Sequence, residues 1–416
     1  MHEGLKKTFE EDFKKSIYGR KFMKTMENLL SERILSTPPS FVRSILKTAM
    51  DPEIISFAGG LPNPVSFPQE ELLKSMDNIV KTFGSTVFQY SITAGIPELR
   101  QYIADRYNKK FNLGLNAENV LITTGSQQAL DLISKTILNK NDGVVLEKPS
   151  YLGAIQVFSQ YQPKFYTVDL AEDGLNTAQL KDVLKNDIKM MYAIPEFQNP
   201  TGLTYSAQNR EEIYEILKDK NIVLIEDDPY GELRFEGKHL PYIGAGKLEN
   251  SIVLGSFSKI VTPGMRTGFL ISKNAELIKH ISIAKEASDL HTNVFSQYLI
   301  WDYLMKNDLE AHIAKITDLY KKQAQTMLEA MDKYFPKTVK YTRPKGGMFL
   351  WVTLPEGVSS LKLFPKALEK KVAFVPGDPF YINKKDVNTM RLNYTNADCE
   401  TIIEGIKRLG ELLSEL

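Results

Sequence analysis

Residues 251–268 read SIVLGSFSKIVTPGMRTG, a short apolar run followed by two serines, a lysine and an arginine set among glycines. The first five residues have the nearly continuous apolar character of a strand buried on both faces of a sheet. Lys259 follows this strand, where partial desolvation lowers the pKa of an amine and frees it as a nucleophile. The hydroxyls of Ser256 and Ser258 and the forked guanidinium of Arg266 suit a phosphate dianion. The stretch therefore predicts a strand end that carries a nucleophilic lysine beside an anion site.

Similar apolar runs alternate with segments of helical spacing through the middle of the chain. The strand-like runs are Asn119–Thr124, Gly143–Glu147, Lys189–Ile194, Ile222–Glu226 and Gly268–Ser272, and the helical segments include Gln127–Leu138 and Ala207–Lys218. Buried strands with helices between them predict an α/β domain with a mainly parallel sheet covered on both faces.

The pattern changes after about residue 300. Long charged helices are expected over Asp302–Phe335, then strands at Met348–Thr353, Val372–Val375 and Met390–Tyr394, and a last helix over Asp398–Leu413. This order predicts a separate α+β lobe. We expect an N-terminal extension over residues 1–25, the first part of a small domain over 26–75, a large domain over 76–304 and the rest of the small domain over 305–416. Met26–Asp51 is expected to be helical and to pack with the C-terminal lobe.

The composition is that of an ordinary soluble globular protein of 416 residues, with 43% hydrophobic and 25% charged residues. The 52 basic and 51 acidic residues leave a net charge of +1 and give no indication of nucleic-acid binding. No apolar stretch is long enough to span a membrane, and the N-terminus lacks the apolar core of a signal peptide. The single cysteine, Cys399, fits a reducing cytoplasm and is expected to have no chemical role.

Two more motifs fall at predicted strand ends. Residues 123–128 read TTGSQQ, where Gly125 permits a tight turn into a helix. The free amides of that helix, with the hydroxyl of Ser126, would bind an anion, although an ordinary helix cap explains the motif equally well. Residues 199–202 read NPTG, which alone is an ordinary turn sequence.

Three acids stand in a row at the end of another predicted strand, in Glu226-Asp227-Asp228 before Pro229 and Tyr230. They would repel one another unless a cation or donor lies nearby, and a pyridinium nitrogen needs such a carboxylate. Neither histidine nor a further acidic cluster accompanies them, so we expect no metal. Acids of a solvent-facing loop are the alternative interpretation.

Together and in this order, the four motifs resemble the fold-type I pyridoxal-phosphate (PLP) enzymes of the class I/II aminotransferase group. The resemblance runs from about Pro38 to the C-terminus. The phrases SFAGGLPNP (Ser56–Pro64), FQYSITAGIPEL (Phe88–Leu99) and IEDDPY (Ile225–Tyr230) are most similar to the aminoadipate and kynurenine aminotransferase subgroup. The resemblance implies a large PLP-binding domain with a mainly parallel, seven-stranded type of sheet flanked by helices. It also implies a smaller α+β domain built from the two chain ends, and a homodimer with shared sites.

The resemblance also implies a role for each polar residue. Lys259 would carry PLP as a Schiff base and shuttle a proton, while Asp227 would pair with the ring nitrogen. The remaining cofactor contacts would be Tyr230 and Asn199 at the ring hydroxyl oxygen, Tyr151 on the ring face, Ser126, Gln127, Ser256, Ser258 and Arg266 at the phosphate, and Tyr90 at the phosphate of the neighbouring subunit. In the substrate site, Arg391 would hold the α-carboxylate, with Asn199 and Gly60 beside it. Arg43, on a helix over Pro38–Met50, could meet a distal carboxylate.

The implied reaction is ping-pong transfer of an amino group from an L-amino acid to a 2-oxo acid such as 2-oxoglutarate. The expected donors are 2-aminoadipate, glutamate, and leucine-type or aromatic amino acids. A β-lyase or a decarboxylase on the same scaffold is an alternative; Arg391 argues against loss of the carboxylate that it would hold, but not against β-elimination. A transcription regulator with an aminotransferase-like domain would need a helix-turn-helix module ahead of the core region, which only about 25 residues precede.

Overall fold

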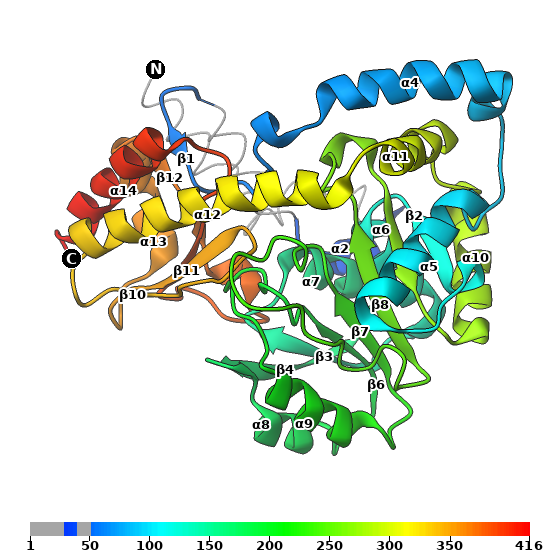
Figure 1. The fold of residues 1–416 in the computed structure, drawn as a ribbon. Coiled ribbons are helices and arrows are strands. Elements are labelled where there is room, and N and C mark those ends of the chain that lie inside the picture. Colours follow the sequence, from blue (N-terminus) through cyan, green and yellow to red (C-terminus); the bar gives the residue numbers. More distant parts are fainter. Residues whose placement is uncertain (1–28, 40–50) are drawn as a thin grey trace.

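A large, mainly parallel sheet dominates the structure, a computed structural model that describes residues 29–39 and 51–416 (Figure 1). In the described part it has eight strands, in the order β2-β9-β8-β7-β6-β3-β4-β5. Their bounds are β2 (Val120–Thr123), β3 (Gly143–Lys148), β4 (Lys164–Ala171), β5 (Gly174–Leu175), β6 (Ile188–Ala193), β7 (Val223–Asp227), β8 (Ser251–Ser256) and β9 (Gly268–Ile271). The five central strands run parallel to one another, in the order β8, β7, β6, β3 and β4. Two strands are antiparallel to their neighbours: β9, between β2 and β8, and β5, beside β4. The predicted fold class is confirmed.

The central strands are buried on both faces because alternate side chains enter two separate cores. On β6, Met190 and Tyr192 belong to one core, whereas Met191 and Ala193 belong to the other. The first core is shared with α5 (Pro97–Phe111), α6 (Ser126–Ile137), α7 (Leu152–Ser159) and α10 (Ala275–Asp289). The second is covered by α8 (Thr177–Val183) and α9 (Ala207–Leu217), which lie together beside the sheet in Figure 1. This double burial is the reason for the continuous apolar runs in the sequence.

The smaller lobe is built around an antiparallel sheet of order β10-β11-β14-β13. Its strands are β10 (Lys340–Tyr341), β11 (Phe349–Thr353), β13 (Val375–Pro376) and β14 (Thr389–Asn393), accompanied by α13 (Ser360–Glu369) and α14 (Cys399–Leu413). The long helix α12 (Leu309–Tyr334) packs against α14. An early segment joins this lobe, since β1 (Ile55–Ser56) pairs in parallel with β12 (Val372–Ala373).

The structure differs from the sequence-based expectations in three segments. Strands β4 and β5 were not expected, and the helices expected from Asp302 begin earlier, with α11 (Val294–Lys306) ahead of α12. Between Met26 and Asp51, the described residues 29–39 contain only the short helix α2 (Glu32–Ser36), followed by Pro38 and Pro39. The carbonyl of Pro38 in this segment accepts a hydrogen bond at 2.9 Å from Gln156 Nε2 of α7. The expected packing of Met26–Asp51 with the C-terminal lobe stays a prediction, because residues 26–28 and 40–50 lie outside the described part of the chain.

The remaining expectations for the N-terminal region lie outside the described residues. These are the extension over residues 1–25 and most of the helix over Pro38–Met50. The domain limits at residues 26, 76 and 305 remain predictions. Over the described ranges, none of the helices is both long and apolar enough to cross a membrane.

Candidate active site

The predicted nucleophile Lys259 lies just beyond the carboxyl end of β8. Its Nζ donates a hydrogen bond to the carbonyl oxygen of Gly60 at 2.9 Å, which ties this strand end to the N-terminal segment. Burial, followed by the positive charges of Arg391 and Arg266, lowers the pKa of the Lys259 amine to about 8. A larger share of this amine is therefore uncharged at neutral pH than in an ordinary lysine, so the side chain can act as a nucleophile or a base.

Asp227 ends the neighbouring strand β7 and is buried. Its Oδ2 accepts a hydrogen bond from the hydroxyl of Tyr192 at 2.7 Å, whereas its Oδ1 is buried and accepts none from any described residue. Burial raises the pKa of Asp227 to about 7, because few groups around it stabilise the charged form. A buried acceptor without a partner is costly, so Oδ1 suits a cationic donor such as a protonated ring nitrogen.

The adjacent Asp228 differs from Asp227 in having both oxygens engaged. The backbone amide of Gly231 donates to its Oδ1 at 2.8 Å, and the hydroxyl of Tyr242 donates to its Oδ2 at 2.6 Å. Asp228 therefore holds the loop after β7 in place, and Asp227 is the member of the pair with an oxygen free to accept from a ligand.

The turn between β2 and α6 has features that suit the expected anion site. Gly125, with a φ of 77°, precedes the helix, and a Cβ there would lie 2.6 Å from Nη2 of Arg266. The guanidinium of Arg266 therefore rests directly on the turn, close to the free amides at the start of α6. Ser126 Oγ is buried at this helix start and has no hydrogen-bond partner in the described part of the chain. The geometry suits an anionic group such as a phosphate.

Arg391, Asn199 and Tyr230 form one hydrogen-bonded chain from β14 to β7. Arg391 Nη1 donates to Asn199 Oδ1 at 2.9 Å, and Asn199 Nδ2 donates to the Tyr230 hydroxyl at 3.2 Å. Arg391 Nη2 donates to the carbonyl of Ala58 at 2.9 Å, while Nε is buried and has no partner among the described residues. Burial lowers the pKa of Arg391 to about 10, so it remains a cation at neutral pH and can hold a carboxylate.

Four of the remaining expected residues, Tyr151, Gln127, Ser256 and Ser258, lie next to this constellation. Tyr151, at the start of α7, is close to Gln127, with its hydroxyl 3.5 Å from Gln127 Oε1. Gln127 Nε2 also donates to the carbonyl of Gly153 at 3.0 Å. Ser256 Oγ accepts a hydrogen bond from the backbone amide of Ser258 at 3.1 Å, which shapes the turn before the lysine.

Two expected residues are not placed at the site by the described structure of the single chain. Tyr90 is 77% exposed and packs edge-on against His291, with ring centroids 5.7 Å apart. Its role at the phosphate of a neighbouring subunit therefore stays a prediction. Arg43 lies outside the described residues, so its position in the site stays a prediction.

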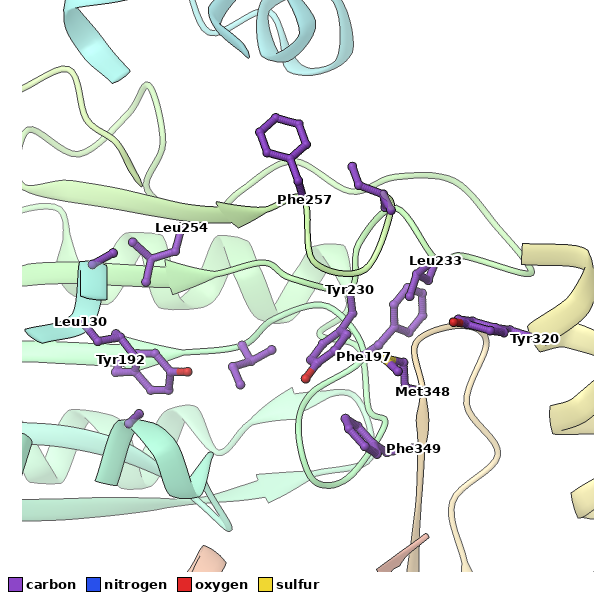
Figure 2. Packing of buried hydrophobic residues seen from close by; sticks show 14 of the residues in the cluster. Leu130, Tyr192, Phe197, Tyr230, Leu233, Leu254, Phe257, Tyr320, Met348 and Phe349 are labelled. Carbon is purple, nitrogen blue, oxygen red and sulfur yellow. The ribbon is translucent and has the colours of Figure 1, made fainter. Parts of the chain in front are cut away.

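Sequence reasoning missed the residues that support the site from outside the motifs. The centroid of the Phe349 ring lies 4.2 Å from the Arg391 guanidinium carbon and 5.7 Å from the centroid of the Tyr230 ring. Figure 2 shows the rings of Phe349 and Tyr230 near each other. Phe380 lies 5.3 Å from the same guanidinium. Tyr192 belongs to a predicted strand, but its contact with Asp227 could not be predicted from the sequence. The contact arises because β6 pairs with β7, which allows the Tyr192 hydroxyl to donate a hydrogen bond to Asp227.

Comparison with known proteins gives a consistent result. A family model described as aminotransferase class I and II matches residues 66–409. The chain is 39% identical to aromatic-amino-acid aminotransferase 1 of Thermococcus litoralis, over 94% of this chain and 95% of that protein.

Two solved structures are similar over nearly their whole length. The kynurenine aminotransferase of Pyrococcus horikoshii is 40% identical with a TM-score of 0.90, covering 95% of this chain and 99% of that one. The α-aminoadipate aminotransferase of Thermus thermophilus, solved with N-(5'-phosphopyridoxyl)-L-leucine, is 40% identical with a TM-score of 0.87. That match covers 94% of this chain and 98% of the other.

Proposed function

Because this chain belongs to the aminotransferase class I and II family and is a PLP-dependent transaminase, we propose a particular substrate range and kinetic order for it. It transfers the amino group of 2-aminoadipate, glutamate, leucine-type or aromatic L-amino acids to a 2-oxo acid such as 2-oxoglutarate, in a ping-pong order. The similar proteins act on aromatic amino acids, kynurenine and α-aminoadipate by name, which supports a broad donor range. The observation that carries the proposal is the convergence of Lys259, the unpartnered Asp227 Oδ1 and the buried Arg391 at one sheet edge.

The residues at this edge fit pyridoxal phosphate. When bound, the cofactor supplies a carbonyl carbon that accepts an amino group and a ring that withdraws electrons. Its phosphate would be held by Ser126, Gln127, Ser256, Ser258 and Arg266. Its ring nitrogen would donate a hydrogen bond to Asp227 Oδ1. Asn199 and Tyr230 would hold the ring hydroxyl oxygen, and Tyr151 would lie on the ring face.

Three groups of the chain act on the substrate itself. Arg391 orients it by binding the α-carboxylate, and Gly60 lies beside it as part of the wall. Nζ of Lys259 takes the proton from the substrate α-carbon and returns it, because a partly uncharged amine is a competent base at neutral pH. The hydrogen bond from Arg391 to Asn199 couples the substrate end of the site to the cofactor end.

The order of the reaction can be tested with one substrate at a time. In a ping-pong reaction, an amino donor alone should change the visible absorption of the holoenzyme and release one 2-oxo acid per site. Adding 2-oxoglutarate should then restore the original spectrum. A panel of acidic, aromatic, leucine-type and small donors, followed by this spectral change, ranks the substrates. A donor that reacts only when 2-oxoglutarate is already present would contradict the ping-pong order.

Replacing Arg391 by alanine should impair all donors alike, because every donor has an α-carboxylate. A hydrogen bond to a charged group contributes roughly 1.5–3 kcal/mol, so kcat/KM should fall at least about tenfold. Arg343→Ala is the control, since that exposed arginine pairs with Asp332 on the surface. The measurement is kcat/KM for an acidic and an apolar donor in each variant.

Arg43 is proposed to affect only donors with a second carboxylate. In Arg43→Ala, glutamate and 2-aminoadipate should react more slowly, while leucine and phenylalanine should react nearly as before. Equal losses for both donor classes would remove Arg43 from side-chain recognition. A loss confined to acidic donors in Arg391→Ala would show that the two arginines have exchanged roles.

The active unit is proposed to be a homodimer that shares its sites through Tyr90. Large apolar side chains gather on and after α4 (Gln69–Phe83), which lies at the outside of the molecule against α11 (Figure 1). The exposed members are Leu73, Met76, Val80, Phe88, Tyr90 and Ile92. An exposed apolar patch of this kind favours an interface between proteins, and a second copy of the chain is the proposed occupant.

Subunit exchange tests the shared site. If Tyr90 serves the opposite subunit, a mixed dimer of Lys259→Ala and Tyr90→Ala chains has one site with both defects and one with neither. Mixing the two impaired proteins should therefore restore activity, measured against each protein alone. Exchange that is demonstrated by mass labels but restores nothing would contradict this arrangement.

A further inference from the structure

The hydroxyl of Tyr192 occupies one carboxylate oxygen of Asp227, and the proposed cofactor contact uses the other. Tyr192 is completely buried on β6, and its hydroxyl donates to Asp227 Oδ2 at 2.7 Å, leaving Oδ1 without a partner among the described residues. Phe158 of α7 packs edge-on against the tyrosine ring, with centroids 5.6 Å apart. In Figure 2 the hydroxyl of Tyr192 points toward the side on which Tyr230 lies. The packing therefore fixes both the ring and the direction of its hydrogen bond.

The hydrogen bond from Tyr192 affects which group holds the proton that Asp227 would share with the cofactor ring nitrogen. When a carboxylate and a ring nitrogen share one proton in a buried site, the proton can lie on either group. A donor that binds the charged carboxylate favours the arrangement with the proton on the nitrogen. We propose that Tyr192 is a positioning residue that keeps the proton on the cofactor nitrogen by donating to Asp227. The inference rests on the proposed pairing of Asp227 with that nitrogen.

The surroundings of Asp227 make such a donor necessary. Burial raises the pKa of Asp227, and the negative charges of Asp228 and Glu147 raise it further, so the site by itself favours a protonated carboxyl. The hydrogen bond from Tyr192 opposes that tendency. Burial raises the pKa of Tyr192 well above its usual value, so its hydroxyl stays a donor over the working range of pH. The titratable groups that face Asp227 are Tyr192 from β6, Glu147 from β3, Tyr151 from the start of α7, and Asp228 and Tyr230 from its own loop.

A matched pair in the same loop provides the control. Tyr242 also donates its buried hydroxyl to an aspartate, Asp228 Oδ2, at 2.6 Å. However, the other oxygen of Asp228 is already occupied by the Gly231 amide. Tyr242→Phe therefore removes the same kind of hydrogen bond without altering a group that faces the cofactor.

The experiment measures the protonation of the ring nitrogen directly. Holoenzyme loaded with pyridoxal phosphate labelled with ¹⁵N in the ring is titrated with pH and followed by solid-state NMR, in the wild type, Tyr192→Phe, Tyr242→Phe and Asp227→Asn. In Tyr192→Phe the ratio of protonated to unprotonated nitrogen should fall roughly 10- to 150-fold, the usual effect of a hydrogen bond to a charged group. The titration midpoint should fall correspondingly, by about one to two pH units. Tyr242→Phe should titrate as the wild type does.

The outcomes separate this inference from the proposal on which it rests. A wild-type titration in Tyr192→Phe, together with a changed one in Asp227→Asn, would overturn the role of Tyr192 alone. A wild-type titration in Asp227→Asn would instead overturn the pairing of Asp227 with the nitrogen. Equal shifts in Tyr192→Phe and Tyr242→Phe would mean that the effect is a general loosening of the loop. If Tyr192→Phe does not fold, 3-fluorotyrosine placed at position 192 is a stronger donor and should raise the midpoint; an unchanged midpoint would overturn the inference.

Discussion

Replacing Lys259 by alanine should leave a folded protein that binds pyridoxal phosphate but transaminates several orders of magnitude more slowly. In the proposed mechanism the lysine both anchors the cofactor covalently and moves the proton at the substrate α-carbon. A positioned acid–base group alone contributes ~10²–10⁴-fold to a rate. The buried amine, with its pKa lowered to about 8 and its direction set by the Gly60 carbonyl, is well suited to both tasks. The cofactor should still bind, because the phosphate site at Ser126 and Arg266 is untouched by the change.

Single-turnover rates and borohydride trapping measure this effect. In the wild type, borohydride should remove the visible absorption band and fix the cofactor on one peptide that contains Lys259; in Lys259→Ala it should fix none. Lys273→Ala is a matched control, since the Lys273 amine also donates to a backbone carbonyl, that of Leu113, at 3.1 Å. It should change stability slightly and activity little. Turnover in Lys259→Ala close to that of the wild type, or a label on another lysine, would show that the base lies elsewhere.

The sequence was most informative about strands that are buried on both faces. β3, β7 and β8 appear as apolar runs because each face of the sheet has its own core. β4 was missed because most of its residues are only half-buried, and its end carries the charged Asp169, which pairs with Lys148. Near the edge of the sheet, where only the two-residue strand β5 lies beyond β4, the hydrophobic signal is weaker because the strand is less covered.

In the candidate site, the sequence predicts the residues that directly follow the apolar runs of strands. Residues such as Lys259 and Asp227 come directly after apolar runs, so their meeting at one edge follows from the parallel sheet. Contacts between segments distant in the chain leave no such local signal. The hydrogen bonds of Arg391 with Asn199 and with Ala58 join residues 192 and 333 positions apart. The family resemblance favours Asp227 over Asp228, but the physical difference between them, the partners of their oxygens, leaves no signal in the sequence.

Asp227→Asn should therefore lose most of its activity, whereas Asp228→Asn should be nearly normal. A neutral amide at 227 cannot stabilise a protonated ring nitrogen, and the loss of one hydrogen bond between charged groups already reduces a rate roughly 10- to 150-fold. At 228, asparagine keeps one oxygen that can accept from Gly231 or Tyr242, so the change should cost about 1 kcal/mol of stability.

Each variant replaces one carboxylate oxygen by an amide nitrogen, at adjacent positions at the end of β7, so the two variants are controls for each other. Thermal unfolding monitors the fold, and kcat/KM with one donor monitors the reaction. Both variants should unfold cooperatively near the wild-type temperature, because each substitution preserves side-chain volume. Only Asp227→Asn should show a large loss of kcat/KM, since only Asp227 has a buried oxygen facing away from its protein partners. If Asp228→Asn proved to be the impaired variant, the register of the motif would be off by one residue, and the oxygen of Asp228 held by Gly231 would have to turn toward the cofactor.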